Sequence, residues 1–169
     1  MVKPDLTFRA GLEKDWPEIW QMIRPVFAAG ETYPVSPDIS ETDAYTYWMK
    51  TPRATYIAML PDGTLAGSYY IRPNQPDLGD HVCNCGYIVA ENMRGSGIAS
   101  RLCQHSQQIA VQLGFSAMQY NLVVASNEVA VHVWQKNGME IIGTIRNAFR
   151  HSTLGLTDAH IMYKWLLDG

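Results

Sequence analysis

The sequence predicts an α/β protein in which helices flank a mixed β-sheet, with elements in the order βααβββαβαββ. Three observations support this fold class. Segments that alternate between apolar and polar residues are interleaved with segments whose apolar residues recur every three to four positions. Capping and turn residues stand at the boundaries between these segments. The hydrophobic fraction of 47%, against 17% charged residues, is sufficient for a buried core.

A short strand and a long helix should open the chain. Residues 6–9 alternate and predict the strand. Asp15 should cap the helix, because Glu18 follows three residues later as in a capping box and Pro17 lies in the first turn. Pro25 should kink or end this helix, because proline has no N–H and crowds the preceding turn.

The rest of the chain shows the same two patterns of apolar residues, alternation in strands and recurrence every three to four positions in helices. The expected elements are a helix at 41–49, strands at 55–60, 65–71 and 81–89, a helix at 95–113, a strand at 118–124, a helix at 128–136, and strands at 141–146 and 159–166. Asp62-Gly63 favours a hairpin turn, and Gly114 and Asn137-Gly138 should stop the last two helices. No repeat or linker interrupts the chain, so residues 1–169 should form a single domain.

The composition argues against several classes of protein. A net charge of -3 favours neither nucleic acid nor an anionic membrane surface as a partner. No apolar run approaches the ~20 residues that cross a bilayer, and no secretory core opens the chain. Cys83 and Cys85 form a C-x-C pair without a second pair, and Cys103 stands apart, so no metal site is predicted. We expect a cytoplasmic protein with reduced thiols.

A glycine-rich turn joins the strand that ends at Val89 to the following helix. The first turn of a helix has unpaired N–H groups and a partial positive charge, so such a junction binds phosphate. A P-loop would need a Gly-Lys-Ser/Thr sequence, which is missing. A dinucleotide fingerprint would need a third glycine where Ser100 stands and an acidic residue near position 117. A helix start with glycines for packing remains the plain alternative.

Two segments resemble signatures of the GNAT N-acetyltransferase superfamily. The Gln/Arg-x-x-Gly-x-Gly/Ala signature matches Arg94-Gly95-Ser96-Gly97-Ile98-Ala99. The second signature begins with an Asn that opens a helix and is matched by Asn127, Ala130, Trp134, Lys136 and Gly138-Met139. The resemblance covers nearly the whole chain. It implies a GNAT-type sheet, acetyl-CoA as cosubstrate, and transfer of the acetyl group to a primary amine of a small molecule or amino-acid-like acceptor.

The resemblance also implies roles for individual residues. Ile88 and Val89 should pair with the pantetheine amides, and Asn127 should contact the cofactor. Lys136 could offset a phosphate charge. The pyrophosphate should be held by the backbone of Arg94, Gly95, Ser96, Gly97, Ile98 and Ala99.

The catalytic groups are less evident from the sequence. At pH 7, deprotonation costs about 1.4 kcal/mol for an α-amine and roughly 4.6 kcal/mol for a lysine-type amine, so a base must assist. Many relatives use a Tyr at the position of Trp134 to protonate the thiolate, and indole is no acid. Alternate residues 81–89 share one strand face without a carboxylate. On that face, Tyr87 could relay a proton or form a pocket wall, and His81 lies at the strand start.

The loop after the first helix should cover the acceptor. In relatives this region lies over the acceptor site, so Glu31 could attract an ammonium group or act as a base through water, and Tyr33 could contact the substrate. Two other functions remain open at this point: a protein or peptide N-terminal acetyltransferase, and a non-catalytic acetyl-CoA-binding module. A homodimer is compatible with the sequence, which does not specify an oligomeric state.

Overall fold

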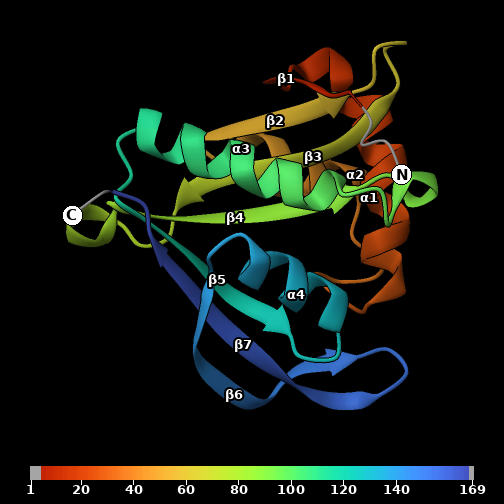
Figure 1. Cartoon of the computed structure of the whole chain (residues 1–169). Helices are drawn as coiled ribbons and strands as arrows, with labels where there is room; N and C mark the ends of the chain where they lie inside the picture. The colour runs from red at the N-terminus through yellow and green to blue at the C-terminus, as the bar shows by residue number, and fades with distance from the viewer. Residues whose placement is uncertain (1–4, 168–169) are drawn as a thin grey trace.

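The computed structural model describes residues 5–167, through which one seven-stranded sheet runs in the order β1-β2-β3-β4-β5-β7-β6 (Figure 1). The predicted element order is confirmed. The elements are β1 (Thr7–Ala10), α1 (Trp16–Ala29), α2 (Glu41–Tyr45), β2 (Ala54–Met59), β3 (Leu65–Pro73), β4 (Val82–Val89), α3 (Ile98–Gln112), β5 (Ala117–Val124), α4 (Glu128–Lys136), β6 (Glu140–His151) and β7 (Gly155–Trp165). A π-helical turn over Thr46–Lys50 continues α2.

The sheet is antiparallel except between β4 and β5, which run parallel. Their ladder pairs Val82 with Ala117 and Cys83 with Met118, and beyond these pairs the two strands diverge (Figure 1). The Asn84 side chain donates to the Gln119 carbonyl at 3.0 Å, immediately past the last pair. The sheet is therefore open along the carboxyl-terminal half of β4.

Helices cover the two faces of the sheet. On one face α3 lies over β3 and β4 while α4 lies beside it over β5 and β7, and α1 and α2 lie behind β3 and β4 (Figure 1). The α1 face buries an aromatic core that includes Phe27, Trp48 and Tyr70. The α3 face buries a second cluster that includes Leu102, Met118 and Met162. Burying these large side chains is the main favourable contribution to folding.

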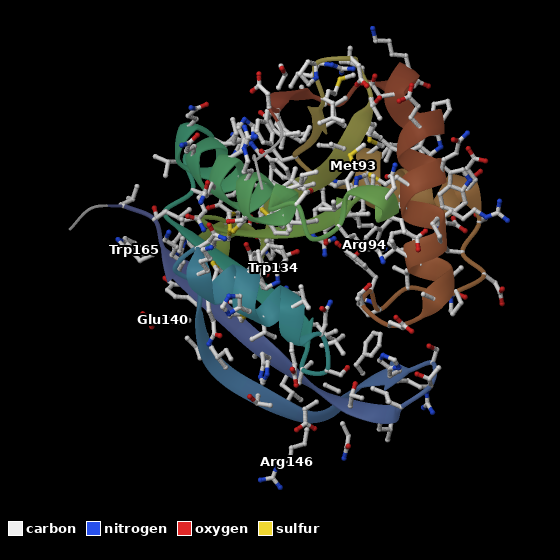
Figure 2. All side chains as sticks on the ribbon, turned by 45° about the vertical axis from the view of Figure 1, so that its right-hand side comes forward. Met93, Arg94, Trp134, Glu140, Arg146 and Trp165 are labelled. Carbon is white, nitrogen blue, oxygen red and sulfur yellow. The ribbon has the colours of Figure 1, made fainter. Side chains whose placement is uncertain are left out.

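Strand β6 forms an edge of the sheet and is the most exposed strand. Glu140 and Arg146 of β6 and Trp165 of β7 point away from the ribbon (Figure 2). Both final strands are longer than the sequence predicted, because the hairpin continues past a register shift near Asn147, which has a positive φ of 52°. Among residues 5–167, no helix is both long and apolar enough to span a membrane.

Two helix boundaries differ from the sequence-based expectation. Helix α1 runs through Pro25 and ends at Gly30 in the left-handed conformation, because Ile23 and Phe27 on either side of the proline are both fully buried. Helix α3 begins at Ile98 rather than at residue 95. Gly95 and Gly97 have φ values of +78° and +82°, and these angles cannot continue a right-handed helix.

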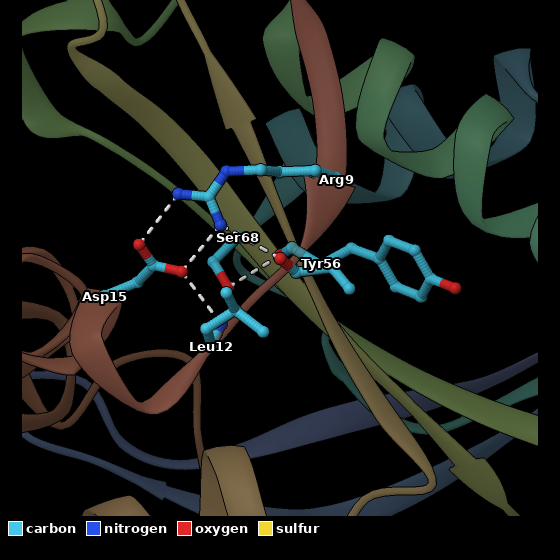
Figure 3. A network of polar contacts seen from close by, with 6 residues as sticks. Arg9, Leu12, Asp15, Tyr56 and Ser68 are labelled. Atoms are coloured by element: carbon cyan, nitrogen blue, oxygen red, sulfur yellow. Dashed lines mark hydrogen bonds and ion pairs between the residues drawn. The ribbon is translucent and has the colours of Figure 1, made fainter.

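Asp15 is the N-cap residue of α1, as predicted, but its side chain makes no capping bond to that helix. Its carboxylate instead accepts two hydrogen bonds from the Arg9 guanidinium, both at 2.7 Å, and one from the Leu12 N–H at 2.8 Å (Figure 3). These bonds lower the pKa of the Asp15 carboxyl group. The forked geometry of Arg9 suits a carboxylate better than a neutral helix N–H does. Asp15 therefore ties β1 to the start of α1.

We expect Asp15→Asn to reduce the free energy of unfolding at pH 7 by about 1–2 kcal/mol, because charge-assisted bonds are lost. The folded-state pKa of Asp15 lies below the unfolded value of about 4, so this stabilisation is present above pH ~4 and is lost as pH falls through the folded pKa. Urea unfolding of the wild type and the variant at pH 7 and pH 3 measures the difference in their free energies of unfolding. An equal difference between variant and wild type at both pH values would contradict this role.

Candidate active site

The opening between β4 and β5 exposes main-chain groups of β4. The N–H of Asn74 donates to the Val82 carbonyl, and that of Ala90 to the Ala66 carbonyl, so even-numbered residues of β4 bond toward β3. By strand alternation, the main-chain groups of Tyr87 and Val89 point toward β5, which has already diverged. Extended amides of a ligand could complete this edge as a partner strand would.

Of the two β4 residues expected to pair with pantetheine, only Val89 turns its main-chain groups into the opening. The main chain of Ile88 faces β3, since its carbonyl oxygen would lie 3.0 Å from a Cβ on Gly67. The Ile88 side chain is buried in the α1-face core. Tyr87 takes the second position along this edge.

The turn between β4 and α3 has the features of an anion site. Gly95 and Gly97 are left-handed, and a Cβ on either residue would meet no atom within 4 Å. Neither a side-chain cap nor an acidic residue occupies the first turn of α3. The Ser96 hydroxyl donates to the Met93 carbonyl, which fixes the loop that carries Arg94. The turn therefore leaves room beside the unpaired N–H groups of the helix start, as binding of a diphosphate would require.

Asn137 ties α4 to the first turns of α3. Its side chain exchanges hydrogen bonds with Ser100 and accepts one from Gln104 at 3.0 Å. Its carbonyl accepts from Gln107 and Lys164, both at 3.0 Å. The residue that ends α4 thus fixes the two helices on either side of the opening.

Three aromatic side chains fill the α3 side of the opening. The ring centre of Trp134 lies 4.8 Å from that of Tyr87 and 5.5 Å from that of Tyr120. In Figure 2, Trp134 lies between α3 and α4, some way from Arg94 at the start of α3. The indole packs against the core of the α3 face.

The Tyr87 hydroxyl belongs to a directed hydrogen-bond chain. Ser106 donates to the Cys103 carbonyl, so it accepts from Tyr87 at 2.7 Å, and Tyr87 in turn accepts from Tyr120 at 2.8 Å. Burial raises the pKa of Tyr87 and of Tyr120 well above the ordinary tyrosine value. Tyr87 therefore keeps its proton at neutral pH, which argues against a role as a base.

The loop after α1 reaches the opening from the other face. The Tyr33 hydroxyl donates to the Tyr87 carbonyl at 2.9 Å, so the structure brings these two predicted residues together. Thr32 has a buried hydroxyl oxygen without a hydrogen-bond partner. Glu31 is exposed. The Gly30 carbonyl accepts a hydrogen bond from the Ser152 N–H at 3.0 Å, which joins the β6–β7 turn to this loop.

A row of amide side chains, which the sequence analysis missed, crosses from β3 to β5 on the face that carries Tyr33. Asn84 donates to the Gln119 carbonyl, Gln119 donates to Asn121 at 3.0 Å, and Asn121 donates to Asn74 at 2.7 Å. The signal in the sequence was a pair of amides two residues apart in a predicted apolar strand, which places both on one face. No residue of β4 on either face is a carboxylate.

The remaining candidates lie in varied surroundings. Asn127 caps α4 by accepting from the Ala130 N–H at 3.2 Å, and Lys136 is exposed in the last turn of that helix. His81 is exposed before β4 begins. Burial raises the pKa of the Cys85 and Cys103 thiols, which disfavours a thiolate nucleophile.

Comparisons with known proteins agree with this architecture. The model of the acetyltransferase (GNAT) family matches residues 16–139. The chain is 28% identical to N-acetyltransferase aca1 of Schizosaccharomyces pombe in an alignment 148 positions long, which covers 78% of this chain and 71% of that protein. A GCN5-related N-acetyltransferase from Kribbella flavida superposes with a TM-score of 0.90 and 39% identity, covering 95% of this chain and 98% of that one.

A further structural neighbour has a cofactor bound. The phosphinothricin acetyltransferase of Sinorhizobium meliloti in complex with acetyl-CoA shares the fold, with a TM-score of 0.84 at 17% identity, over 97% of this chain and 90% of that one. The chain belongs to the GNAT family of acetyltransferases. It is an acetyl-CoA-dependent N-acetyltransferase with acetyl-CoA as its cosubstrate. The glycine turn and the open β4 edge fit that molecule, whose thioester supplies the acetyl group.

We expect Gly97→Glu to abolish acetyl-CoA binding, because a carboxylate at the anion site repels the diphosphate. Gly63→Glu is the matched control, since Gly63 is also left-handed with open space around it but lies in the β2–β3 turn. Both variants should lose about 1 kcal/mol of stability from backbone strain. Calorimetric titration with acetyl-CoA distinguishes the two variants, because only Gly63→Glu should still bind it. Retained affinity in a folded Gly97→Glu protein would place the phosphates elsewhere.

Proposed function

We propose that this enzyme transfers the acetyl group from acetyl-CoA directly to the primary amine of a small, amino-acid-like acceptor. The observation that carries the proposal is the contact between Gly30 and Ser152, which closes the loop after α1 onto the β6–β7 turn. The proposed acceptor space lies in front of the amide row, on the side of the sheet away from α3. A loop tied to the β6–β7 turn on that side leaves less room for an extended chain, which favours a small acceptor.

The polar groups around this space suit an amine that loses its proton easily. Deprotonation at pH 7 costs about 1.4 kcal/mol for an α-amine and roughly 4.6 kcal/mol for a lysine-type amine. The β4 strand offers Asn84 rather than a carboxylate beside the opening, so a strong base is missing there. An α-amine makes the smaller demand. Positioning against the acetyl donor can then supply much of the rate.

Tyr87 and Glu31 are the proposed proton-handling residues. Tyr87 keeps its proton and lies against Trp134, where many relatives place the tyrosine that protonates the thiolate. Glu31 lies two residues before Tyr33, in the loop that reaches β4, and its exposed carboxylate can take a proton through water. Asn127, Lys136 and the backbone of residues 94–99 are the proposed cofactor contacts, with Val89 at the strand end. Ile88 is not among them, because its main chain faces β3.

The test is the release of free coenzyme A with a panel of amines. The panel holds L-amino acids, their carboxamides, alkylamines and peptides with a free N-terminus, each with acetyl-CoA and purified protein. We expect at least one small α-amine to be acetylated faster than any peptide. Faster acetylation of peptides would make this a peptide N-terminal acetyltransferase. Release of coenzyme A with none of these amines would refute the proposed acceptor class.

We expect Trp134→Phe to keep most of kcat, whereas Tyr87→Phe and Glu31→Gln each lower it about tenfold or more, because positioned acid–base groups contribute this much. The control for Tyr87→Phe is Tyr56→Phe, because the Tyr56 hydroxyl has no hydrogen-bond partner within residues 5–167. The control for Glu31→Gln is Glu13→Gln, because Glu13 is also exposed. A pH profile of kcat/KM with one accepted amine provides the measurement. Collapse of kcat in Trp134→Phe alone would reverse these assignments.

A further inference from the structure

Arg72 of β3 is a half-buried cation that pairs with no carboxylate within residues 5–167. Its guanidinium carbon lies 5.3 Å from the ring centre of Tyr70 and 5.8 Å from that of Tyr47. The faces of these rings attract the cation and hold it in place. Ring faces accept little of its hydrogen-bonding capacity, so the fork of N–H donors remains available to a planar anion.

The position of Arg72 places this cation beside the proposed acceptor space. In the β3–β4 ladder Arg72 is opposite Asn84, the first member of the amide row, so both lie on the same face. Tyr70 is opposite Gly86 and lies directly over it, since a Cβ on Gly86 would be 2.5 Å from Tyr70 Cε1. The Arg72 guanidinium, which stacks on Tyr70, therefore lies between Asn84 and Gly86.

The distances suit an α-amino acid. A strand advances about 3.3 Å per residue, so the ladder position of Arg72 is roughly 7 Å from that of Gly86. An arginine side chain spans most of that length. The amine and carboxylate of an amino acid are attached to the same carbon atom. A carboxylate on this guanidinium would thus leave the amine close to the open edge of β4.

We infer that Arg72 binds the carboxylate of the acceptor and so selects amines that carry an acid group on the adjacent carbon. The inference rests on the proposed function and names the acceptor's second recognition element. Arg–carboxylate pairs are frequently bidentate, which fixes orientation as well as charge. The neighbouring amides of Asn84 and Asn121 are neutral, so they do not compete with the substrate for this cation.

A purely structural role for Arg72 makes a different prediction. If Arg72 only held Tyr47 and Tyr70 together, its loss would lower stability and would affect all acceptors alike. A carboxylate-binding role raises KM for acceptors with an acid group and leaves their carboxamides nearly unchanged. Comparing the two kinds of acceptor on the same variant therefore separates the roles.

The experiment measures KM and kcat for Arg72→Gln and Arg72→Lys at saturating acetyl-CoA, with each L-amino acid that the wild type acetylates and with its carboxamide. Arg53→Gln is the matched control, because Arg53 also stacks on a ring, Phe115, at 5.3 Å but lies before β2. For Arg72→Gln we expect KM for the amino acid to rise about tenfold or more, and KM for the carboxamide to change less than about threefold. Arg72→Lys should be intermediate, since lysine keeps the charge without the fork.

Equal losses on both acceptors, together with a lower melting temperature, would overturn the inference and leave Arg72 a structural residue. A wild type that acetylates amino acids and carboxamides with equal kcat/KM would also overturn it, while the proposed function would stand. A wild type that acetylates no small amine would refute the proposed function and this inference with it.

Discussion

The divergence of β4 and β5 after two ladder pairs is the constraint on which the rest of the site depends. Parallel neighbours require a crossover, and α3 provides it, so the anion-binding turn lies at the carboxyl end of β4. Divergence deprives that half of β4 of its neighbouring strand. A buried main-chain group without a partner costs about 1–3 kcal/mol. Tyr33 offsets part of this cost at the Tyr87 carbonyl, and we propose that the cosubstrate pairs with the remainder of the edge.

Local chemistry made most of the fold predictable from sequence. Asn127 and Asn137-Gly138 bound α4 as expected, because capping and left-handed termination depend on adjacent residues alone. Two differences, at Pro25 and Asp15, arose where tertiary contacts compete with a local rule. Pro25 does not end α1, because the buried residues around it hold the helix on the sheet. The Asp15 side chain makes no capping bond to α1, because Arg9 in β1 offers its carboxylate a charged, forked partner.

The candidate site shows the same division. The turn at residues 94–99 is continuous in sequence, so its glycines could be read as an anion site before the fold was known. The contacts beside the proposed acceptor space join segments far apart in the sequence: Tyr33 with Tyr87, and Gly30 with Ser152. These depend on strand register and on where a loop comes to rest. No sequence motif marks Arg72, because its proposed role depends on its position opposite Asn84 in the β3–β4 ladder.

The electrostatics of the acceptor face bear on how the amine loses its proton. A carboxylate beside the amine could act as a base, but it would also stabilise the ammonium form and raise the amine's pKa. The amide row has no such effect, and Tyr33 and Tyr70 on this face remain neutral because burial raises their pKa values. Arg72 is cationic and disfavours a neighbouring ammonium until a carboxylate neutralises it. The face thus tolerates the neutral, nucleophilic amine, and a distant base such as Glu31 needs only to receive the proton through water.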